Sequence, residues 1–214
     1  MAKLKVGKVL AFAGISGCGK STLARSLAPL LGAQLLSEPE VDSWPAIARD
    51  QAHYGPALAL FAFRQLWAAY FIDADRLRGT GQIAILDSYF FKTNGAYLGL
   101  PGMDWLLPAT DPYLTVFQAM TQLDEQYFPD VDGVILVDIS AVDRTRMLTA
   151  RGRDSDRLAG FSENYALERQ YVRQATFDHC RRYQIPVLEF QHHFGEPVTQ
   201  AAELAKLLKQ HWSL

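Results

Sequence analysis

The sequence predicts a three-layer α/β fold in which a five-stranded parallel sheet is flanked by helices. Short apolar runs alternate with longer helical patterns along the 214 residues. Runs that are apolar throughout indicate strands covered on both faces, as in parallel sheets. Because 49% of the residues are hydrophobic, the chain can bury a full core. We therefore expect a single domain over residues 1–214.

The apolar runs and helical patterns follow one another in a regular order. The expected strands are residues 8–13, 34–37, 83–87, 133–138 and 186–190. The expected helices are residues 20–31, 56–78, 113–126, 141–151, 162–183 and 197–211. Ligands of such sheets bind beyond the carboxyl ends of the strands, so functional residues should lie just after each strand.

The amino-acid composition indicates which kinds of partner and which cell compartment to expect. The formal net charge is -2, so no basic excess predicts a nucleic-acid partner. Two cysteines make no disulfide framework, which favours a cytoplasmic protein. The apolar run near the N-terminus leads directly into a glycine-rich turn and is interpreted as a strand rather than a signal peptide. Since no uncharged apolar stretch is long enough to span a bilayer, we expect no membrane partner.

The first expected strand leads into GISGCGKST, residues 14–22, which has the spacing of a phosphate-binding loop. Its glycines let backbone N–H groups turn inward around a phosphate, and the following helix adds its positive end. Lys20 can reach the β and γ phosphates of ATP, and the Ser21 hydroxyl can ligate Mg²⁺. The alternative is a glycine-rich turn with a helix-capping serine. We expect ATP and Mg²⁺ to bind here, with the nucleotide contacted by Gly14, Ser16, Gly17, Cys18, Gly19, Lys20, Ser21 and Thr22.

Cys18 is the unusual residue of this loop. It is interpreted as a small side chain that fits the turn. The alternative is a thiol made acidic by the amino end of the following helix.

Two further strands end in carboxylates. Glu38 follows the second strand and can act as a general base towards an acceptor hydroxyl or orient Mg²⁺ or substrate; the alternative is a solvated loop glutamate. Asp87 ends the third strand and is expected to hold the metal ion or its water. The alternative for Asp87 and Ser88 is a helix N-cap.

The helix expected at 56–78 is apolar almost all round and should be buried or form a cleft wall. Arg64 shares a face with apolar residues, and its guanidinium needs an anionic partner. That partner is either an internal carboxylate or a substrate phosphate, and the pattern does not decide between them. Aromatic residues of this helix, Trp67 among them, can stack on a planar base or belong to the core.

After the fourth strand, arginines gather in a glycine-broken, highly charged stretch. We interpret residues of about 150–160 as an arginine-rich lid that closes over a transferring phosphoryl group, with Arg151, Arg153 and Arg157 as its charges. The alternative is a charged surface loop.

Taken together, these pieces resemble the thymidylate kinase and deoxynucleoside kinase group of P-loop kinases, and thymidylate kinase-like proteins most closely. The resemblance is carried by residues 14–22, 38–39, 60–64, 81–89, 96–99, 129–130, 151–157, 161 and the helix around Tyr165. It implies a P-loop NTPase fold, a lid over ATP, Mg²⁺ dependence and often a homodimer. It implies catalytic roles for Lys20, Glu38, Asp87 and the lid arginines, and acceptor contacts from Glu38, Arg64, Trp67 and Tyr97.

The sequence departs from that resemblance on the acceptor side. Ser88 stands where the group has an arginine, while Trp44 matches many deoxynucleoside kinases. The leading hypothesis is a nucleoside monophosphate kinase using ATP and Mg²⁺, with Arg64 on the acceptor's phosphate. The alternatives are a deoxynucleoside kinase acting on a 5′-hydroxyl, a kinase for another small hydroxyl compound, and a nucleotide-binding module without catalysis.

Overall fold

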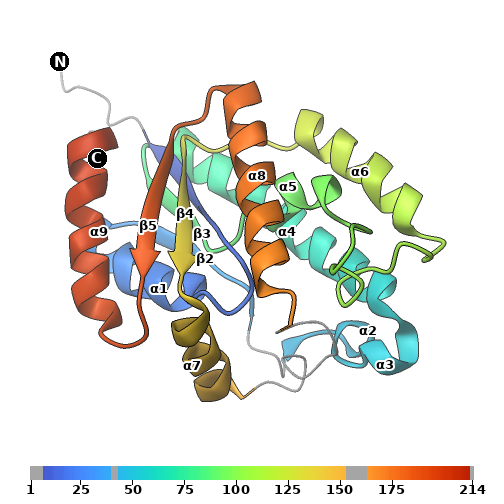
Figure 1. Ribbon diagram of the computed structural model, residues 1–214. Helices are drawn as coiled ribbons and strands as arrows, with labels where there is room; N and C mark the ends of the chain where they lie inside the picture. Colours follow the sequence, from blue (N-terminus) through green and yellow to red (C-terminus); the bar gives the residue numbers. More distant parts are fainter. Residues whose placement is uncertain (1–6, 40–42, 153–162, 213–214) are drawn as a thin grey trace.

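The computed structural model describes residues 7–39, 43–152 and 163–212, and contains the expected parallel sheet (Figure 1). Its strands are β1 (Lys8–Ala13), β2 (Gln34–Leu36), β3 (Ile83–Leu86), β4 (Gly133–Ile139) and β5 (Val187–His192). They lie in the order β2-β3-β1-β4-β5, and every neighbouring pair is parallel. The predicted fold class is confirmed, with strand ends shifted by one or two residues.

Helices cover the sheet on both sides, because alternate strand residues face opposite layers. On β1, Leu10 and Phe12 pack in a core with α1 (Lys20–Leu31) and α9 (Pro197–Trp212). Val9 and Ala11 of the same strand pack in a second core with α4 (Pro56–Gly79). The long helix α8 (Tyr165–Tyr183) contributes to both cores. In Figure 1, α9 lies at one edge of the molecule and α4 towards the other.

The remaining helices surround the carboxyl edge of the sheet and one side of the molecule. They are α2 (Ala46–Arg49), α3 (Gln51–Tyr54), α5 (Phe90–Thr93), the 3₁₀ turn η2 (Asn94–Ala96), α6 (Leu114–Tyr127) and α7 (Ala141–Arg151). Of these, α6 and α7 were predicted, and the short ones were not, because a single turn has no hydrophobic periodicity to detect. No helix among the described residues is long and apolar enough to cross a membrane.

Candidate functional site

A cavity of about 610 Å³ lies beyond the carboxyl ends of β1, β2 and β3. Its wall includes the phosphate loop, the acids Glu38 and Asp87, and the aromatic side chains Trp44, Phe63, Trp67, Phe90, Tyr97 and Trp105. The volume is in the range of small-molecule sites, roughly 300–1,000 Å³. The position is the one expected for the ligand site of a parallel sheet.

The turn between β1 and α1 needs glycine where another residue would not fit. Gly14 has a φ of +143°, and a Cβ there would lie 2.6 Å from the Val137 carbonyl oxygen. Gly19 has a φ of +85°, and a Cβ there would lie 2.4 Å from Cε1 of His192. Helix α1 begins directly after Gly19, so the unpaired N–H groups of its first turn are available to an anion. The sequence pattern therefore forms the predicted loop.

Lys20 closes over this loop. Its Nζ donates hydrogen bonds to the carbonyl oxygens of Gly14 and Ile15, both at 2.8 Å. Since Lys20 also lines the cavity, its ammonium is held where a bound phosphate would meet it.

Cys18 faces away from the cavity. Its side chain is fully buried in the core shared with α1 and α9. Burial raises the pKa of the Cys18 thiol, and the nearby charge of Lys20 does not offset this. Cys18 is therefore a small core side chain, and the alternative of an acidified thiol is contradicted. Only its backbone can contact a nucleotide.

Asp87 is a buried carboxylate beside the loop. It is 2% exposed, and its Oδ2 has no hydrogen-bond partner among the residues that the structure describes. Burial raises the pKa of Asp87, although a hydrogen bond from the Ser21 hydroxyl and the charge of Lys20 lower it. The N-cap alternative is not met by either residue, because the N-cap of α5 is Tyr89 and no side chain caps the helix. Ser88 stands one residue earlier, and its Oγ accepts the Phe90 N–H at 3.3 Å.

An orphaned carboxylate oxygen next to a hydroxyl fits a magnesium ion. Ser21 and Asp87 supply the hard oxygen donors that Mg²⁺ prefers. Within the described ranges, no three His, Cys, Asp or Glu side chains form a metal cluster. An ion here would keep water molecules and take its other ligands from nucleotide phosphates, as is usual for Mg²⁺.

A buried ion pair between α7 and α8 holds the phosphate loop in place. It was not predicted from the sequence. Glu168 of α8 accepts the Ser16 N–H at 3.0 Å, and Arg144 of α7 donates to the Ser16 carbonyl at 2.9 Å. Arg144 and Glu168 are themselves joined at 2.8 Å, with side chains 3% and 4% exposed. Burial raises the pKa of Glu168, against the opposing charge of Arg144. No local pattern could reveal this contact, because Ser16 and Glu168 lie 152 residues apart.

Arg64 is placed differently from the expected acceptor contact. Its Nε donates to Oδ2 of Asp124 on α6 at 2.7 Å, and a second bond joins the same two groups. The carboxylate is 5% exposed, and the guanidinium also lies 5.2 Å from the Phe128 ring centre. The internal carboxylate is therefore the partner of Arg64, which is not part of the cavity wall. The expectation of an acceptor phosphate at Arg64 is corrected by this ion pair.

The other predicted acceptor residues do meet in the cavity. Trp67 and Tyr97 both line it and are each 2% exposed, so they act as rigid walls. Trp44 packs edge-on against Phe63 with ring centres 4.8 Å apart, and its indole donates to the Pro39 carbonyl. Among the polar wall residues that were not predicted are Gln51 of α3 and Arg25 of α1. Arg25 could have been found from its spacing, since it follows Ser21 by one helical turn.

Only a small part of the expected lid lies among the residues that the structure describes. Arg151 ends α7 and lines the cavity, as expected. Arg153 and Arg157 lie outside the described residues, as does most of the expected lid.

Comparison of the sequence with those of known proteins finds distant relatives. No protein-family model matches the chain. The thymidylate kinases of Xanthomonas campestris pv. campestris strains B100 and 8004 are each 33% identical over 159 residues, or 68% of this chain. The chain spans 62% of the length of these curated relatives.

Solved structures extend the comparison to the whole fold. Deoxyadenosine kinase from M. mycoides, solved with the products dCMP and dCDP, aligns with a TM-score of 0.66 and 18% identity over 94% of this chain and 99% of its own. The same enzyme with dCTP bound gives a TM-score of 0.64 over the same shares. The chain is a distant homologue of thymidylate kinases and shares the fold of a deoxyadenosine kinase. The resemblance expected from the sequence is thereby confirmed.

Proposed function

We propose that the chain transfers the γ-phosphoryl group of ATP to a nucleoside or nucleotide, with Mg²⁺ as cofactor. The observation that carries the proposal is the buried, unpaired oxygen of Asp87 beside Ser21, at the phosphate loop and in a cavity with aromatic walls. An oxygen left without a partner in such a place is costly unless a ligand completes it.

The donor half of the site would work by positioning and charge. The loop N–H groups and Lys20 hold the β and γ phosphates, and Arg151 can approach the transferring group from α7. Mg²⁺, held through Ser21 and Asp87, would supply charge neutralisation on the phosphate oxygens. Arg153 and Arg157 remain part of the proposal as lid residues.

The acceptor half favours a nucleoside with a free hydroxyl. Glu38 follows β2, lines the same cavity as Lys20, and donates its backbone N–H to Asp87. A carboxylate at this place can accept the proton of the attacking hydroxyl. Arg64, the residue expected to meet the phosphate of a monophosphate acceptor, is paired with Asp124. The aromatic walls suit a planar base.

A nucleoside monophosphate, thymidylate above all, is the second candidate. The thymidylate kinase relatives favour it. One cation beyond Lys20 and Arg151, namely Arg25, lines the cavity among the described residues and can meet an acceptor phosphate.

An acceptor screen tests both. The protein, ATP and Mg²⁺ are mixed with each nucleoside and each nucleoside monophosphate, and ADP release is followed. The Lys20→Ala variant, purified in the same way, controls for contaminating kinases. Turnover with nucleosides alone supports the first candidate, and turnover with monophosphates supports the second. ATP binding without turnover on any acceptor would favour a nucleotide-binding module.

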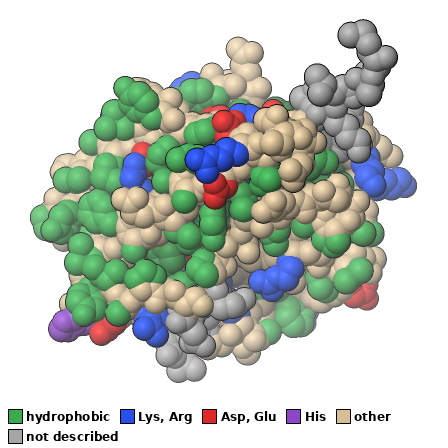
Figure 2. Space-filling view, turned by 180° about the vertical axis from the view of Figure 1, so that it is seen from behind, with side chains coloured by type: hydrophobic (Ala, Val, Ile, Leu, Met, Phe, Trp, Pro, Cys, Tyr) green, Lys and Arg blue, Asp and Glu red, His purple; other side chains and the backbone are tan. Residues whose placement is uncertain are grey.

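We also propose that the protein is a homodimer that pairs through α6. Tyr113, Val116, Met120, Leu123 and Tyr127 follow one another at spacings of three and four residues, which is the seam of a helix pair. Four of them are exposed, from 45% for Tyr113 and Val116 to 77% for Tyr127. Hydrophobic side chains gather on the left of Figure 2, the side on which α6 lies in that view.

The chemistry of this face suits a second copy of the chain. The exposed positions of α6 are Thr115, Val116, Ala119, Gln122, Leu123, Gln126 and Tyr127. None of them is charged, so two copies related by a two-fold axis would bring no like charges together.

A further inference from the structure

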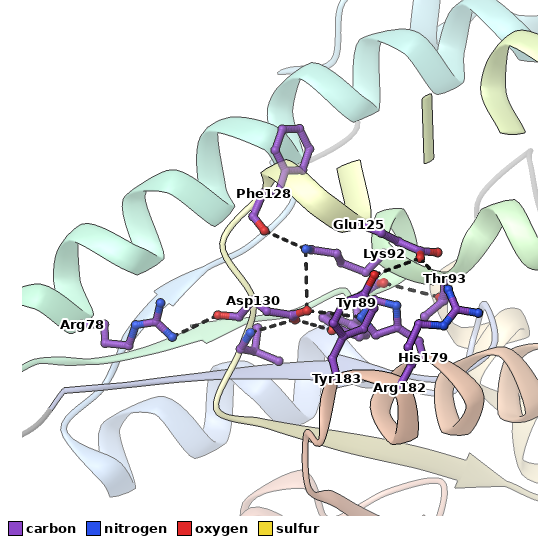
Figure 3. Close-up of polar contacts among 11 residues, drawn as sticks. Arg78, Tyr89, Lys92, Thr93, Glu125, Phe128, Asp130, His179, Arg182 and Tyr183 are labelled. Atoms are coloured by element: carbon purple, nitrogen blue, oxygen red, sulfur yellow. Dashed lines mark hydrogen bonds and ion pairs between the residues drawn. The ribbon is translucent and has the colours of Figure 1, made fainter. Parts of the chain in front are cut away.

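A buried network of polar side chains lies behind the cavity wall and is centred on Asp130 (Figure 3). Oδ1 of Asp130 accepts hydrogen bonds from the Tyr89 hydroxyl at 2.5 Å and the Val131 N–H at 2.9 Å. Oδ2 lies 3.3 Å from Nε2 of His179 and 3.8 Å from Nζ of Lys92. One carboxylate thus joins the segments before β4, after β3 and in α8.

Burial and the contacts of this network shift the pKa values of several of its members. Burial alone would raise the pKa of Asp130, but hydrogen bonds from His179 and Tyr89 and the charge of Lys92 bring it below its usual value. Burial raises the pKa of Tyr89, which therefore stays a neutral donor. Since an ionised carboxylate only accepts, Nε2 of His179 is the donor in its contact with Asp130. Lys92 is fully buried and donates to the Phe128 carbonyl at 2.9 Å.

Tyr89 connects this network to the catalytic groups. It stands two residues after Asp87, and its backbone N–H donates to the Phe12 carbonyl at 2.8 Å. Phe12 in turn stands two residues before Gly14, on the strand that enters the phosphate loop. The side chain of Tyr89 is thus fixed to Asp130 and its backbone to β1.

Stability alone does not account for such a network. Replacing a buried ion pair by apolar residues of similar volume is often neutral or stabilising, because desolvation of the charges offsets their attraction. A network that holds a geometry is different, since a displacement of 1 Å in a catalytic group can cost about a hundredfold in rate.

We propose that Asp130 is a positioning residue which, through the Tyr89 hydroxyl, sets the place of Asp87 relative to the phosphate loop. The inference rests on the proposed function for its kinetic consequence only. Its structural consequence, the ordering of residues 87–89, can be measured without any acceptor.

The test is Tyr89→Phe, which removes one hydroxyl and keeps the aromatic wall. We expect kcat to fall about tenfold, with the KM of the acceptor within about twofold. Mg²⁺ should also raise the ATP affinity of this variant less than it raises that of the wild type. Amide hydrogen exchange at residues 87–89 should become faster. Tyr183→Phe is the matched control: its hydroxyl bonds Glu125 at 3.5 Å and its ring packs on His179. This variant should leave all four readouts unchanged.

Asp130→Asn gives the second arm. Because Asp130 acts through Tyr89, the kinetic losses of Tyr89→Phe and Asp130→Asn should not add in the double variant. Additive losses, or wild-type exchange at residues 87–89 in Tyr89→Phe, would overturn the positioning role. Absence of turnover with every acceptor in the wild type would reject the proposed kinase function, while the exchange data would still decide the role of Asp130.

Discussion

Two opposite charges meet the cavity at the phosphate loop, and each is held by its own neighbours. Lys20 is fixed to the loop carbonyls of Gly14 and Ile15, while Asp87 is fixed by Ser21 and the Glu38 backbone. The ammonium is satisfied without a ligand, whereas the carboxylate keeps one bare oxygen among the described residues. The two residues should therefore respond differently to mutation.

Lys20→Ala should remove turnover and leave the fold intact. The variant loses the charge that would stabilise the transferring phosphoryl group, so we expect a fall in kcat of at least about a hundredfold. The variant also loses the bonds of Lys20 to two loop carbonyls and a long contact with Cys18 Sγ at 3.7 Å, and each hydrogen bond contributes only about 1 kcal/mol. ADP release and thermal unfolding measure the two effects. Unchanged turnover would reject the proposed mechanism.

Asp87→Asn should trade activity for stability. The folded-state pKa of Asp87 is raised above its usual value of 3.8, mainly by burial, so the ionised form costs stability at neutral pH. Asparagine has no such cost. The variant should unfold at a higher temperature than the wild type near pH 7, while kcat and the Mg²⁺ dependence of ATP binding fall, with kcat down about a hundredfold.

The pH dependence of that difference follows from the sign of the shift. As pH falls through the raised pKa, Asp87 becomes protonated in the folded protein and the wild type recovers the lost stability. The stability advantage of Asp87→Asn should therefore shrink on acidification and vanish near pH 3.8. Denaturant unfolding of both proteins across this range measures it, and an advantage that grows on acidification would contradict a raised pKa.

Between elements, the phosphate loop depends on two helices that come much later in the chain. Arg144 of α7 and Glu168 of α8 hold both backbone groups of Ser16. Because α7 also ends in Arg151, this contact links the loop to the first arginine of the proposed lid. The loop is therefore shaped by its own glycines and held in place by the ion pair between α7 and α8.

Arg144→Met should destabilise the protein by about 3–5 kcal/mol, because Glu168 would then be buried without its partner. The double variant Arg144→Met with Glu168→Leu should recover most of this loss, since neither charge remains. Urea unfolding gives both values. Both variants should still bind ATP more weakly than the wild type, because Ser16 is no longer held. A double variant as unstable as the single one would mean that packing, and not the unpaired charge, sets the cost.

How far the sequence could lead is clearest from these elements. Helices α1 and α7 have the predicted bounds, because a glycine lies directly after each, with φ of +59° and +62°. The phosphate loop and the acids Glu38 and Asp87 could be predicted as site residues because each follows an apolar strand. The partner of Arg64 could not be predicted, since Asp124 lies 60 residues away on another helix. Contacts that depend on tertiary packing have no local pattern.

At the scale of the whole molecule, α6 and α9 lie at opposite edges (Figure 1). Both helices expose apolar side chains. Those of α6 form a continuous seam along the helix, whereas Val198 of α9 is exposed at 69% near its first turn. The two sites therefore allow a matched pair of substitutions.

Leu123→Lys should convert the proposed dimer to a monomer. Leu123 is 52% exposed in the middle of the α6 seam, so a two-fold axis near it would bring two lysines together in a desolvated contact. The free chain should lose little stability, because an exposed substitution usually changes the free energy of unfolding by no more than about 0.5 kcal/mol. Sedimentation velocity across a concentration series measures the state. Val198→Lys adds the same charge to α9, and this variant should sediment as the wild type does. A wild-type protein that sediments as a monomer at all concentrations would reject the proposed interface, and equal dissociation by both lysine variants would show an effect of net charge instead of a contact through α6.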